Sequence, residues 1–412
     1  MRDRVDVAVV GAGAAGLGAL ARLAPASLVS LALEARPRVG GRAETARVAR
    51  GPVDLGGGWL HSADVNPLAQ AFERAGFHID RSPPHWERQA GNAGFSDEDQ
   101  AEFRQAFANF DARLEAAARD DRDRAAAELL EPGGRWNPLL DAISTWYNGA
   151  ELDQISVLDY AAYEDSEVNW RVVEGYGAAL AYFADLSRVT TDCPVTRIRH
   201  DGADLVLETP RGLLKAGAAI ITLPTPLLAT GALAFYPDLP EHRAAARGLP
   251  LGLADKAFLG IEGESDLPAN DHLFGRIDRV DTGSYHTRPN GRPYIEAFFG
   301  GRLAQSLEAE GPGAMAAFAV DELAALLGSN WKKRLKPLTE TRWLTDPWSR
   351  GSYSHALPGC AGAREVLARP VEERLFFAGE ATSREYFSTA HGAWESGVRA
   401  AEEAIAALER RR

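Results

Sequence analysis

The residues best suited to chemistry near the N-terminus are three glycines, Gly11, Gly13 and Gly16, which follow the apolar run 5–10. Between a strand and a helix, the first permits a tight turn, the second lets a pyrophosphate approach the backbone, and the third allows close packing. Glu34 ends the next apolar run, where a carboxylate would accept the ribose hydroxyl protons of a dinucleotide. A tight turn without any ligand is the alternative to this dinucleotide site.

NAD and FAD both fit this pattern, and the residues after Glu34 favour FAD. Three arginines, Arg36, Arg38 and Arg42, and the pair Gly40-Gly41 come directly after the carboxylate. Such cations and glycines suit a second phosphate contact and a flavin-bearing dinucleotide. The residues expected to hold the dinucleotide in this part of the chain are Gly11, Gly13, Ala14, Ala15, Gly16, Glu34, Ala35, Arg36, Gly41 and Arg42.

A lysine in an apolar strand is the next candidate for chemistry. Lys256 lies in the segment 253–259, whose other residues are mostly apolar. A lysine on the inward face of such a strand would be costly to desolvate without a purpose. A lysine that points to solvent is the simpler reading of the same pattern.

Several segments, taken in order along the chain, resemble the flavin amine oxidase family. They are Asp54-Leu55-Gly56-Gly57-Gly58-Trp59-Leu60-His61, Val195, Lys256, the segment 343–353 and the segment 376–397. The family includes monoamine oxidases, polyamine oxidases, L-amino acid oxidases and lysine-specific histone demethylases. The resemblance covers most of the chain, and the segment 343–354 looks closest to the polyamine oxidase and demethylase branch.

The resemblance implies further contacts with the flavin. In the family, the glycines of the 54–61 segment run beside the flavin ring, and the residue that matches Val195 contacts the adenine half through its backbone. The helix that begins near Thr389 would direct its first amides at the N1 and O2 edge of the flavin. The cofactor residues implied in this way are Gly57, Gly58, Trp59, Val195, Trp343, Gly379, Glu380, Thr389 and Ala390.

The resemblance also implies two catalytic residues, Lys256 and Tyr353. The matching lysine holds a water against flavin N5, which assists flavin reoxidation or orders the site, and the matching tyrosine forms one wall of an aromatic cage for the amine. Ser352 stands where monoamine oxidases have a cysteine linked to the flavin. A serine cannot form that thioether, so we expect FAD to be bound without a covalent bond.

The expected substrate pocket contains Trp59, His61 and Thr389. Thr389 stands where monoamine oxidases place a second cage tyrosine, which indicates a wider pocket at that wall. His61 matches a histidine that several polyamine oxidases carry near the amine. His391 is expected to face the cofactor or its packing and not to act as a base.

Composition limits the partners of the chain. It has 58 acidic and 45 basic side chains, and its net charge of −13 argues against nucleic acid and favours cationic small molecules. The two cysteines are too few for a disulfide scaffold or a closed zinc site, so we expect no metal and a reducing, cytoplasmic location. No apolar run is long enough for a membrane span.

The elements that must position these residues are those of an α/β protein. Apolar runs at 5–10, 28–33 and 218–223 predict buried strands, and the alternation on both sides of Asn290-Gly291 predicts a hairpin with a type I′ turn. We expect a Rossmann-type FAD-binding fold assembled from 1–80, 190–250 and 340–412. A mixed-sheet and helical substrate domain would then comprise 81–189 and 251–339.

These expectations together predict an FAD-dependent amine oxidase. Hydride would pass from the carbon next to a neutral amine to flavin N5, the imine would hydrolyse, and oxygen would reoxidise the flavin to give hydrogen peroxide. A polyamine or secondary amine is favoured. The alternatives are an L-amino acid oxidase with Arg171 or Arg288 holding the carboxylate, a flavin dehydrogenase or desaturase of an apolar substrate, and a flavin-bound protein without catalysis. The exact substrate and the oligomeric state are not fixed by the sequence.

Overall fold

The buried apolar runs near the N-terminus form the centre of an eight-stranded sheet. The computed structural model describes residues 3–120 and 122–411, and it places strands β11-β8-β9-β10-β1-β2-β7 side by side, with β19 also pairing with β10. Strands β1, β2, β10 and β19 are parallel to one another, as expected for strands covered by helices on both faces. The strands are β1 (Arg4–Val10), β2 (Ser30–Leu33), β7 (Val189–Thr190), β8 (Arg197–Arg199), β9 (Leu205–Thr209), β10 (Gly212–Ile221), β11 (Ala234–Tyr236) and β19 (Leu375–Phe377).

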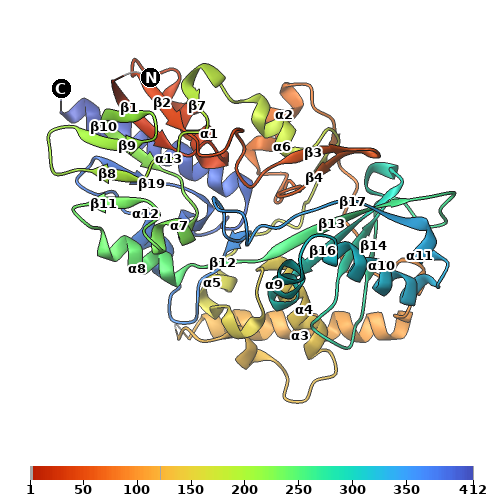
Figure 1. The fold of residues 1–412 in the computed structure, drawn as a ribbon. Coiled ribbons are helices and arrows are strands. Elements are labelled where there is room, and N and C mark those ends of the chain that lie inside the picture. Colours follow the sequence, from red (N-terminus) through yellow and green to blue (C-terminus); the bar gives the residue numbers. More distant parts are fainter. Residues whose placement is uncertain (1–2, 121, 412) are drawn as a thin grey trace.

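Alternate residues of β1 face two different helical layers. Val7 and Val9 pack against α1 (Ala14–Leu23) and α13 (Ala390–Arg410), whereas Ala8 and Val10 face the opposite layer. Figure 1 shows α13 lying along the sheet, with both chain ends at the same side of the molecule. The opposite layer consists of α7 (Thr225–Ala229), α8 (Pro240–Gly248) and α12 (Ala363–Ala368). The sheet therefore has the two-sided cover of a dinucleotide-binding α/β fold.

A second, antiparallel sheet carries Lys256. Its strand order is β14-β15-β16-β13-β17, with β13 (Ala254–Ile261) between β16 (Tyr294–Gly300) and β17 (Leu335–Glu340). The outer strands are β14 (Asp271–Phe274) and β15 (Ser284–Thr287). All eight residues of β13 are buried, so its polar side chains must find partners inside the protein.

Helices cover this second sheet from two sides (Figure 1). One group packs on β13, β15 and β16 in a single apolar core and consists of α9 (Gly301–Glu310), α10 (Ala314–Leu327) and α11 (Trp331–Arg334). Another core joins Phe274 and Phe298 to the helical part of the chain, whose elements are α3 (Asp97–Ala118), η2 (Ala126–Leu129), α4 (Asn137–Tyr147), η3 (Leu152–Gln154) and α5 (Val157–Ala161). Phe103, Phe110 and Leu114, which recur at helical spacing along α3, are buried in this core.

The hairpin at Asn290-Gly291 exists, but its turn differs from the expectation. Strand pairing stops at Thr287 and Ile295, so the connection is longer than a two-residue type I′ turn and contains the short helix η5 (Pro289–Gly291). Asn290 and Gly291 do have positive φ, at 53° and 71°. The local preference was correct, but Pro289 and the additional residues impose a wider loop.

Short elements connect the two sheets. Strands β12 (Leu251–Gly252) and β18 (Tyr353–Ser354) pair with each other. The chain enters the five-stranded sheet after β12 and returns toward the eight-stranded sheet through β18. The remaining elements are β3 (Thr45–Val48), β4 (Gly51–Asp54), α2 (Pro67–Arg74), β5 (Ile79–Asp80), η1 (Ala90–Asn92), β6 (Arg171–Val172), α6 (Tyr176–Tyr182), η4 (Leu186–Arg188) and η6 (Glu380–Thr382). No helix within residues 3–120 and 122–411 has both the length and the apolar character needed to cross a membrane.

Candidate active site

The turn between β1 and α1 requires its glycines for steric reasons. Gly11 has φ +105°, and a Cβ added there would lie 2.5 Å from Thr222 Oγ1. A Cβ on Gly16 would lie 2.1 Å from the Gly11 carbonyl oxygen. The first turn of α1 is therefore held directly against the end of β1. Its free backbone amides are oriented toward the space beyond the sheet edge, as in sites that bind phosphate.

Glu34 lies at the same edge. Its side chain is buried and accepts hydrogen bonds from the backbone N–H groups of Ala12 at 2.7 Å and Arg36 at 2.8 Å. The Arg36 guanidinium is turned away, donating to Asp346 at 2.7 Å and Ser349 at 2.7 Å. The carboxylate predicted to bind ribose is therefore beside the glycine turn, whereas Arg36 joins the turn to the segment that precedes β18.

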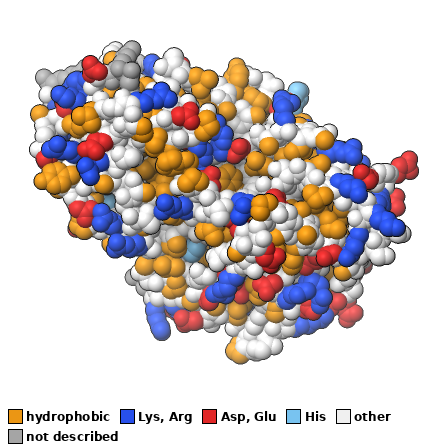
Figure 2. Space-filling view, in the orientation of Figure 1, with side chains coloured by type: hydrophobic (Ala, Val, Ile, Leu, Met, Phe, Trp, Pro, Cys, Tyr) orange, Lys and Arg blue, Asp and Glu red, His pale blue; other side chains and the backbone are white. Residues whose placement is uncertain are grey.

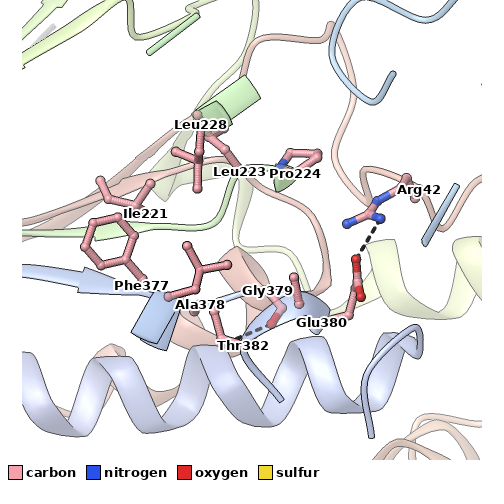
Figure 3. A pocket seen from close by; sticks show the side chains of 12 residues that line it. Arg42, Ile221, Leu223, Pro224, Leu228, Phe377, Ala378, Gly379, Glu380 and Thr382 are labelled. Carbon is pink, nitrogen blue, oxygen red and sulfur yellow. Dashed lines mark hydrogen bonds and ion pairs between the residues drawn. The ribbon is translucent and has the colours of Figure 1, made fainter. Parts of the chain in front are cut away.

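Arg42 and Glu380 are paired in the wall of a small pocket at the ends of β10 and β19 (Figure 3). The Arg42 guanidinium donates to Glu380 at 3.0 Å and to the Ser352 carbonyl at 2.6 Å. Burial would raise the pKa of Glu380, but Arg42, Ser354 and Arg364 outweigh that effect and lower it. Glu380 is thus ionised, and the pocket wall carries a fixed ion pair.

A buried hydrogen-bonded chain continues from Glu380 into the helical region. Ser354 donates to Glu380 at 2.6 Å and accepts from Arg364 at 2.9 Å. Arg364 forms a bidentate pair with Asp159 at 2.6 and 2.8 Å, and its guanidinium lies 3.8 Å from the Phe387 ring centroid. Charge-assisted, bidentate contacts of this kind fix geometry as well as adding energy. The chain therefore links α5 to the pocket wall.

Two of the glycines expected beside the flavin border open space. A Cβ added to Gly57 or Gly379 would meet no atom within 4 Å, whereas one on Gly56 would lie 1.7 Å from the Arg42 carbonyl oxygen. Trp343 is buried close to this segment, and its Nε1 donates to the Leu55 carbonyl at 3.3 Å. The 54–58 segment is therefore packed on one side and free on the other.

Lys256 points into the protein, against the solvent-facing reading of its strand. Its ammonium donates to the carbonyls of Asp54 at 3.0 Å and Gly56 at 2.9 Å, and it pairs with Glu296 at 2.8 Å. A lysine ammonium has three donors, and these three acceptors match them. Lys256 therefore fixes the backbone of the 54–58 segment and places a positive charge beneath it.

Glu296 joins Lys256 to a second cation. Its other carboxylate oxygen accepts from Arg171 at 2.8 Å, and the Arg171 guanidinium lies 4.0 Å from the ring centroid of Trp59. Burial would raise the pKa of Glu296, but the charges of Arg171 and Lys256 outweigh it and hold the pKa well below its ordinary range. The triad has a net charge of +1 and connects the lysine to the expected substrate pocket.

The residues expected around the amine have defined partners. The Tyr353 hydroxyl donates to the Trp146 carbonyl, and burial raises its pKa, so it is a neutral phenol. Thr389 caps α13, accepting from Gly392 N at 3.0 Å. Ser352 donates to the Ala254 carbonyl at 2.8 Å and accepts from its N–H at 2.9 Å, which anchors the residue before Tyr353.

His61 is a neutral imidazole with a defined orientation. Burial lowers its pKa, and its Nδ1 lies 2.7 Å from the amide oxygen of the buried Asn169. Because that oxygen can only accept, Nδ1 carries the proton and Nε2 keeps a free lone pair. Burial, followed by the charge of His61, lowers the pKa of His391 to about 3, so His391 also stays neutral.

Two tyrosines of the helical region lie near acidic side chains. Tyr147 exposes 47% of its surface, and burial is the main cause that raises its pKa. Burial also raises the pKa of the partly exposed Tyr160. The charges of Glu87, Asp165 and Asp111 raise the pKa of Tyr147 further, so acidic side chains surround this tyrosine.

A family model described as flavin containing amine oxidoreductase matches residues 132–405, and one for an NAD(P)-binding Rossmann-like domain matches residues 9–75. The chain belongs to the flavin containing amine oxidoreductase family. It is therefore an enzyme of the flavin amine oxidase type, as the ordered motifs indicated, and the family implies a flavin cofactor and an amine substrate.

Relatives across the family match nearly the whole chain. Polyamine oxidase 2 of Arabidopsis thaliana is 29% identical over 97% of this chain and 87% of its own. Lysine-specific histone demethylase 1 homolog 2 of Oryza sativa is 30% identical over 100% of this chain, which spans only 58% of that relative. A solved structure of wild-type putrescine oxidase bound to putrescine superposes with a TM-score of 0.80 at 18% identity, covering 98% and 99% of the two chains. This last likeness concerns the fold and confirms the α/β expectation.

The geometry fits the FAD that the family implies. The glycine turn lies beside the buried Glu34, and there is open space beside Gly57 and Gly379. Val195 is buried and follows Cys193, whose N–H donates to the Glu34 carbonyl at 2.9 Å, and Ala390 is the first residue of α13. Within the described residues, no group of three or more His, Cys, Asp or Glu could hold a metal ion.

Sequence reasoning missed Glu296, Asn169 and Tyr147. A signal for Glu296 was present, because it is the only charged residue in the otherwise apolar strand 294–300. In the antiparallel register Lys256 pairs with Phe298, and Glu296 follows on the same face. That register could not be read from one sequence, since it depends on the long connection between β13 and β16.

Proposed function

We propose that the chain is an FAD-dependent oxidase of polyamines or secondary amines that holds its flavin without a covalent bond. When bound, the flavin would supply the acceptor for a hydride from the carbon next to a neutral amine, with imine hydrolysis and oxygen-dependent release of hydrogen peroxide completing the turnover. The protein's contribution is orientation, exclusion of water and local charge.

His61 and Tyr353 are proposed to prepare the amine. The free lone pair of His61 Nε2 accepts an N–H from a substrate ammonium, which favours loss of a proton before oxidation. Tyr353 provides an aromatic wall whose hydroxyl is already paired, so it orients the amine without taking its proton. Trp59, held by Arg171, and Thr389 bound the remaining sides.

Lys256 is proposed to order the 54–58 segment and to supply a positive charge near the cofactor. Its three donors already have protein acceptors, which supports the ordering role over a role in holding a water. The residues proposed to hold FAD are those of the glycine turn with Glu34, together with Arg42, Gly57, Gly58, Val195, Trp343, Gly379, Glu380 and Ala390.

The observation that supports a cationic substrate is the group of acidic side chains near Tyr147. Glu87, Asp111 and Asp165 act on Tyr147, and burial with the neighbouring Glu115 raises the pKa of Asp111 to about 6. On the face shown in Figure 2, charges of both signs are intermixed, so the net negative charge of the chain is not gathered there. Such a local group of acidic side chains would attract the second ammonium of a diamine or polyamine.

Anaerobic titration tests the reaction class and the substrate class together. The purified yellow protein is titrated with diamines, polyamines, secondary amines, simple monoamines and L-amino acids, and air is then admitted. We expect polyamines or secondary amines to bleach the flavin absorbance, with recovery and stoichiometric hydrogen peroxide in air. Bleaching without peroxide would contradict the oxidase, and bleaching only by monoamines would contradict the substrate class.

Ser352 supports the non-covalent flavin, because its hydroxyl is bound to the backbone of β13. The free cysteines are Cys193, which is near Glu34, and Cys360, which lies beside Gly248, and neither is in the flavin-ring segments. Acid precipitation should therefore leave all the yellow colour in the supernatant, and a yellow pellet would contradict the proposal.

The two free thiols also support the proposed cytoplasmic location.

A second candidate, an L-amino acid oxidase, has one observation in its favour. Arg171 Nη2 is buried and has no hydrogen-bond partner among the described residues, so it could donate to a carboxylate. Arg171 is already paired with Glu296, however, and Arg288 donates to the Leu267 carbonyl in the hairpin region. A single remaining donor cannot form the bidentate grip that favours a carboxylate.

The division into domains is also a proposal. Strands of the eight-stranded sheet fall within 4–33, 189–236 and 375–377, and those of the five-stranded sheet fall within 254–340. This distribution supports an FAD-binding domain of 1–80, 190–250 and 340–412 and a substrate domain of 81–189 and 251–339. Limited proteolysis with mass mapping would test this division. We expect cuts near the four places where the chain passes from one proposed domain to the other, at about 80, 190, 250 and 340.

A further inference from the structure

Two buried carboxyl groups lie against each other beneath the segment 341–345. Asp255 on β13 is 0% exposed and Glu308 on α9 is 2% exposed, and the two side chains interact directly. One oxygen of Asp255, Oδ1, accepts from Thr341 Oγ1 at 2.6 Å and from Trp343 N at 3.1 Å. Asp255 therefore holds the backbone of the tryptophan that is proposed to contact the cofactor.

Glu308 holds the next two residues of the same segment. Its two carboxylate oxygens accept from Leu344 N at 2.7 Å and from Thr345 N at 3.1 Å. The backbone N–H groups of residues 343–345 thus donate to the two acids, and the segment 341–345 has no regular secondary structure of its own to hold it.

The remaining oxygen of Asp255 lacks a donor. Asp255 Oδ2 is buried and has no hydrogen-bond partner among the described residues, although it belongs to a group in contact with a second carboxylate. Two charged carboxylates cannot stay together in such a site at an acceptable cost, whereas one proton between them removes the repulsion and supplies the missing hydrogen bond. We propose that Asp255 and Glu308 share one proton and that the protonated pair positions Trp343.

The surrounding charges agree with this assignment. Burial, followed by Glu308, raises the pKa of Asp255 to about 8. Lys256 projects from the opposite face of β13 and pairs with Glu296, so its charge is directed elsewhere. The other charged or titratable neighbours are Arg342, which donates to the Glu308 carbonyl at 3.0 Å, and Tyr353, a neutral phenol.

The direction of the pH effect follows from the raised pKa. The proton stabilises the fold fully below the ordinary carboxyl pKa, and this contribution is lost as pH rises toward about 8. Within that window one proton changes the folding equilibrium constant by about tenfold per pH unit, and the slope levels off once the pair is fully ionised. Above that point the two charges repel and the segment 341–345 loses its anchor.

Denaturant unfolding of the FAD-loaded protein between pH 5.5 and 9.5 tests the shared proton. Asp255→Asn replaces the acid by an amide that can accept from Trp343 N and donate to Glu308 without titrating. In wild type the folding equilibrium constant should fall by up to about tenfold per pH unit, and in this variant that fall should be absent. Glu308→Gln provides a second variant with a donor on the other side. Glu340→Gln is the control, because Glu340 also accepts backbone N–H bonds, from Gly313 and Ala316, and should keep the wild-type slope. Parallel curves for wild type and Asp255→Asn would overturn the proposal.

Cofactor affinity tests the positioning of Trp343, which rests on the proposed FAD site. FAD dissociation constants are measured by flavin fluorescence at pH 7 and pH 9 for wild type and Asp255→Asn. We expect wild type to bind about tenfold more weakly at pH 9 and the variant to keep its affinity. Equal ratios for both proteins would overturn the positioning role. If neither bound FAD at either pH, the proposed function would fail, while the unfolding curves of the apoprotein would still decide the shared proton.

Discussion

Glu296 is the residue on which two functional side chains depend. It pairs with Lys256 and Arg171 at 2.8 Å each, and its own side chain is buried. Glu296→Gln should lower the free energy of unfolding by about 3 kcal/mol, because it leaves buried cations without a counter-charge. Chemical denaturation of the FAD-loaded protein measures the change.

The matched control for Glu296 is Glu262→Gln. Glu262 pairs with Lys336 at 3.9 Å, and both side chains are more than half exposed. Removal of that pair should change stability by less than about 1 kcal/mol. Equal decreases in the free energy of unfolding for the two variants would show that the buried triad stabilises the fold no more than a surface ion pair does. The Glu296 variant should also weaken FAD binding, since Lys256 would no longer be held under the 54–58 segment.

Among the elements, α1 and α13 depend on their small residues. A Cβ on Gly397 would lie 1.9 Å from the Ala15 carbonyl oxygen, so the two helices touch backbone to backbone. Gly397→Ala should push α1 away from α13, costing about 1–3 kcal/mol. Because α1 begins at the glycine turn, FAD affinity should fall as well, as measured by flavin fluorescence.

Gly362→Ala is the corresponding control at another helix start. A Cβ at Gly362 would meet nothing within 4 Å, and its φ of −73° suits any residue. That variant should keep or slightly raise the stability, since alanine reduces the entropy of the unfolded chain. A Gly397 variant that bound FAD like wild type would show that the helix contact does not set the cofactor turn.

For the whole molecule, buried histidines set an acid limit to stability. Burial is the first cause that lowers the pKa of His272 and His355 to about 4 and of His391 to about 3. Unfolding releases these groups to bind protons near their ordinary pKa of about 6.5. Stability should therefore fall as pH drops from about 6.5 to 4, by up to about tenfold in the folding constant per histidine and pH unit.

Urea unfolding at pH 7, 6, 5 and 4 measures this acid limit. His272→Gln should flatten the curve by one proton, because glutamine can replace the hydrogen bond between His272 Nε2 and Ser284 at 2.8 Å without titrating. Together with the loss on the alkaline side from Asp255, a maximum of stability near neutral pH is expected.

Much of the fold could be predicted from local sequence. The strands at 5–10, 28–33 and 218–223 could be predicted because an apolar run is a local property of the sequence. The glycine turn and the position of Glu34 could also be predicted, since a short βαβ unit fixes their relative positions. The hairpin at Asn290 was predicted with the wrong turn, because the length of its loop depends on strand pairing on both sides.

The sequence by itself determined the family, the glycine turn and the positions of Lys256, Ser352 and Tyr353 within their motifs. Only the tertiary structure decided which way Lys256 points, that Glu296 joins it to Arg171, and that Asp255 meets Glu308. These pairings connect residues on separate strands and helices, so they depend on register and packing. Burial then determines which charges can exist, because a low-dielectric interior accepts an ionised group only beside a partner that the fold brings to it.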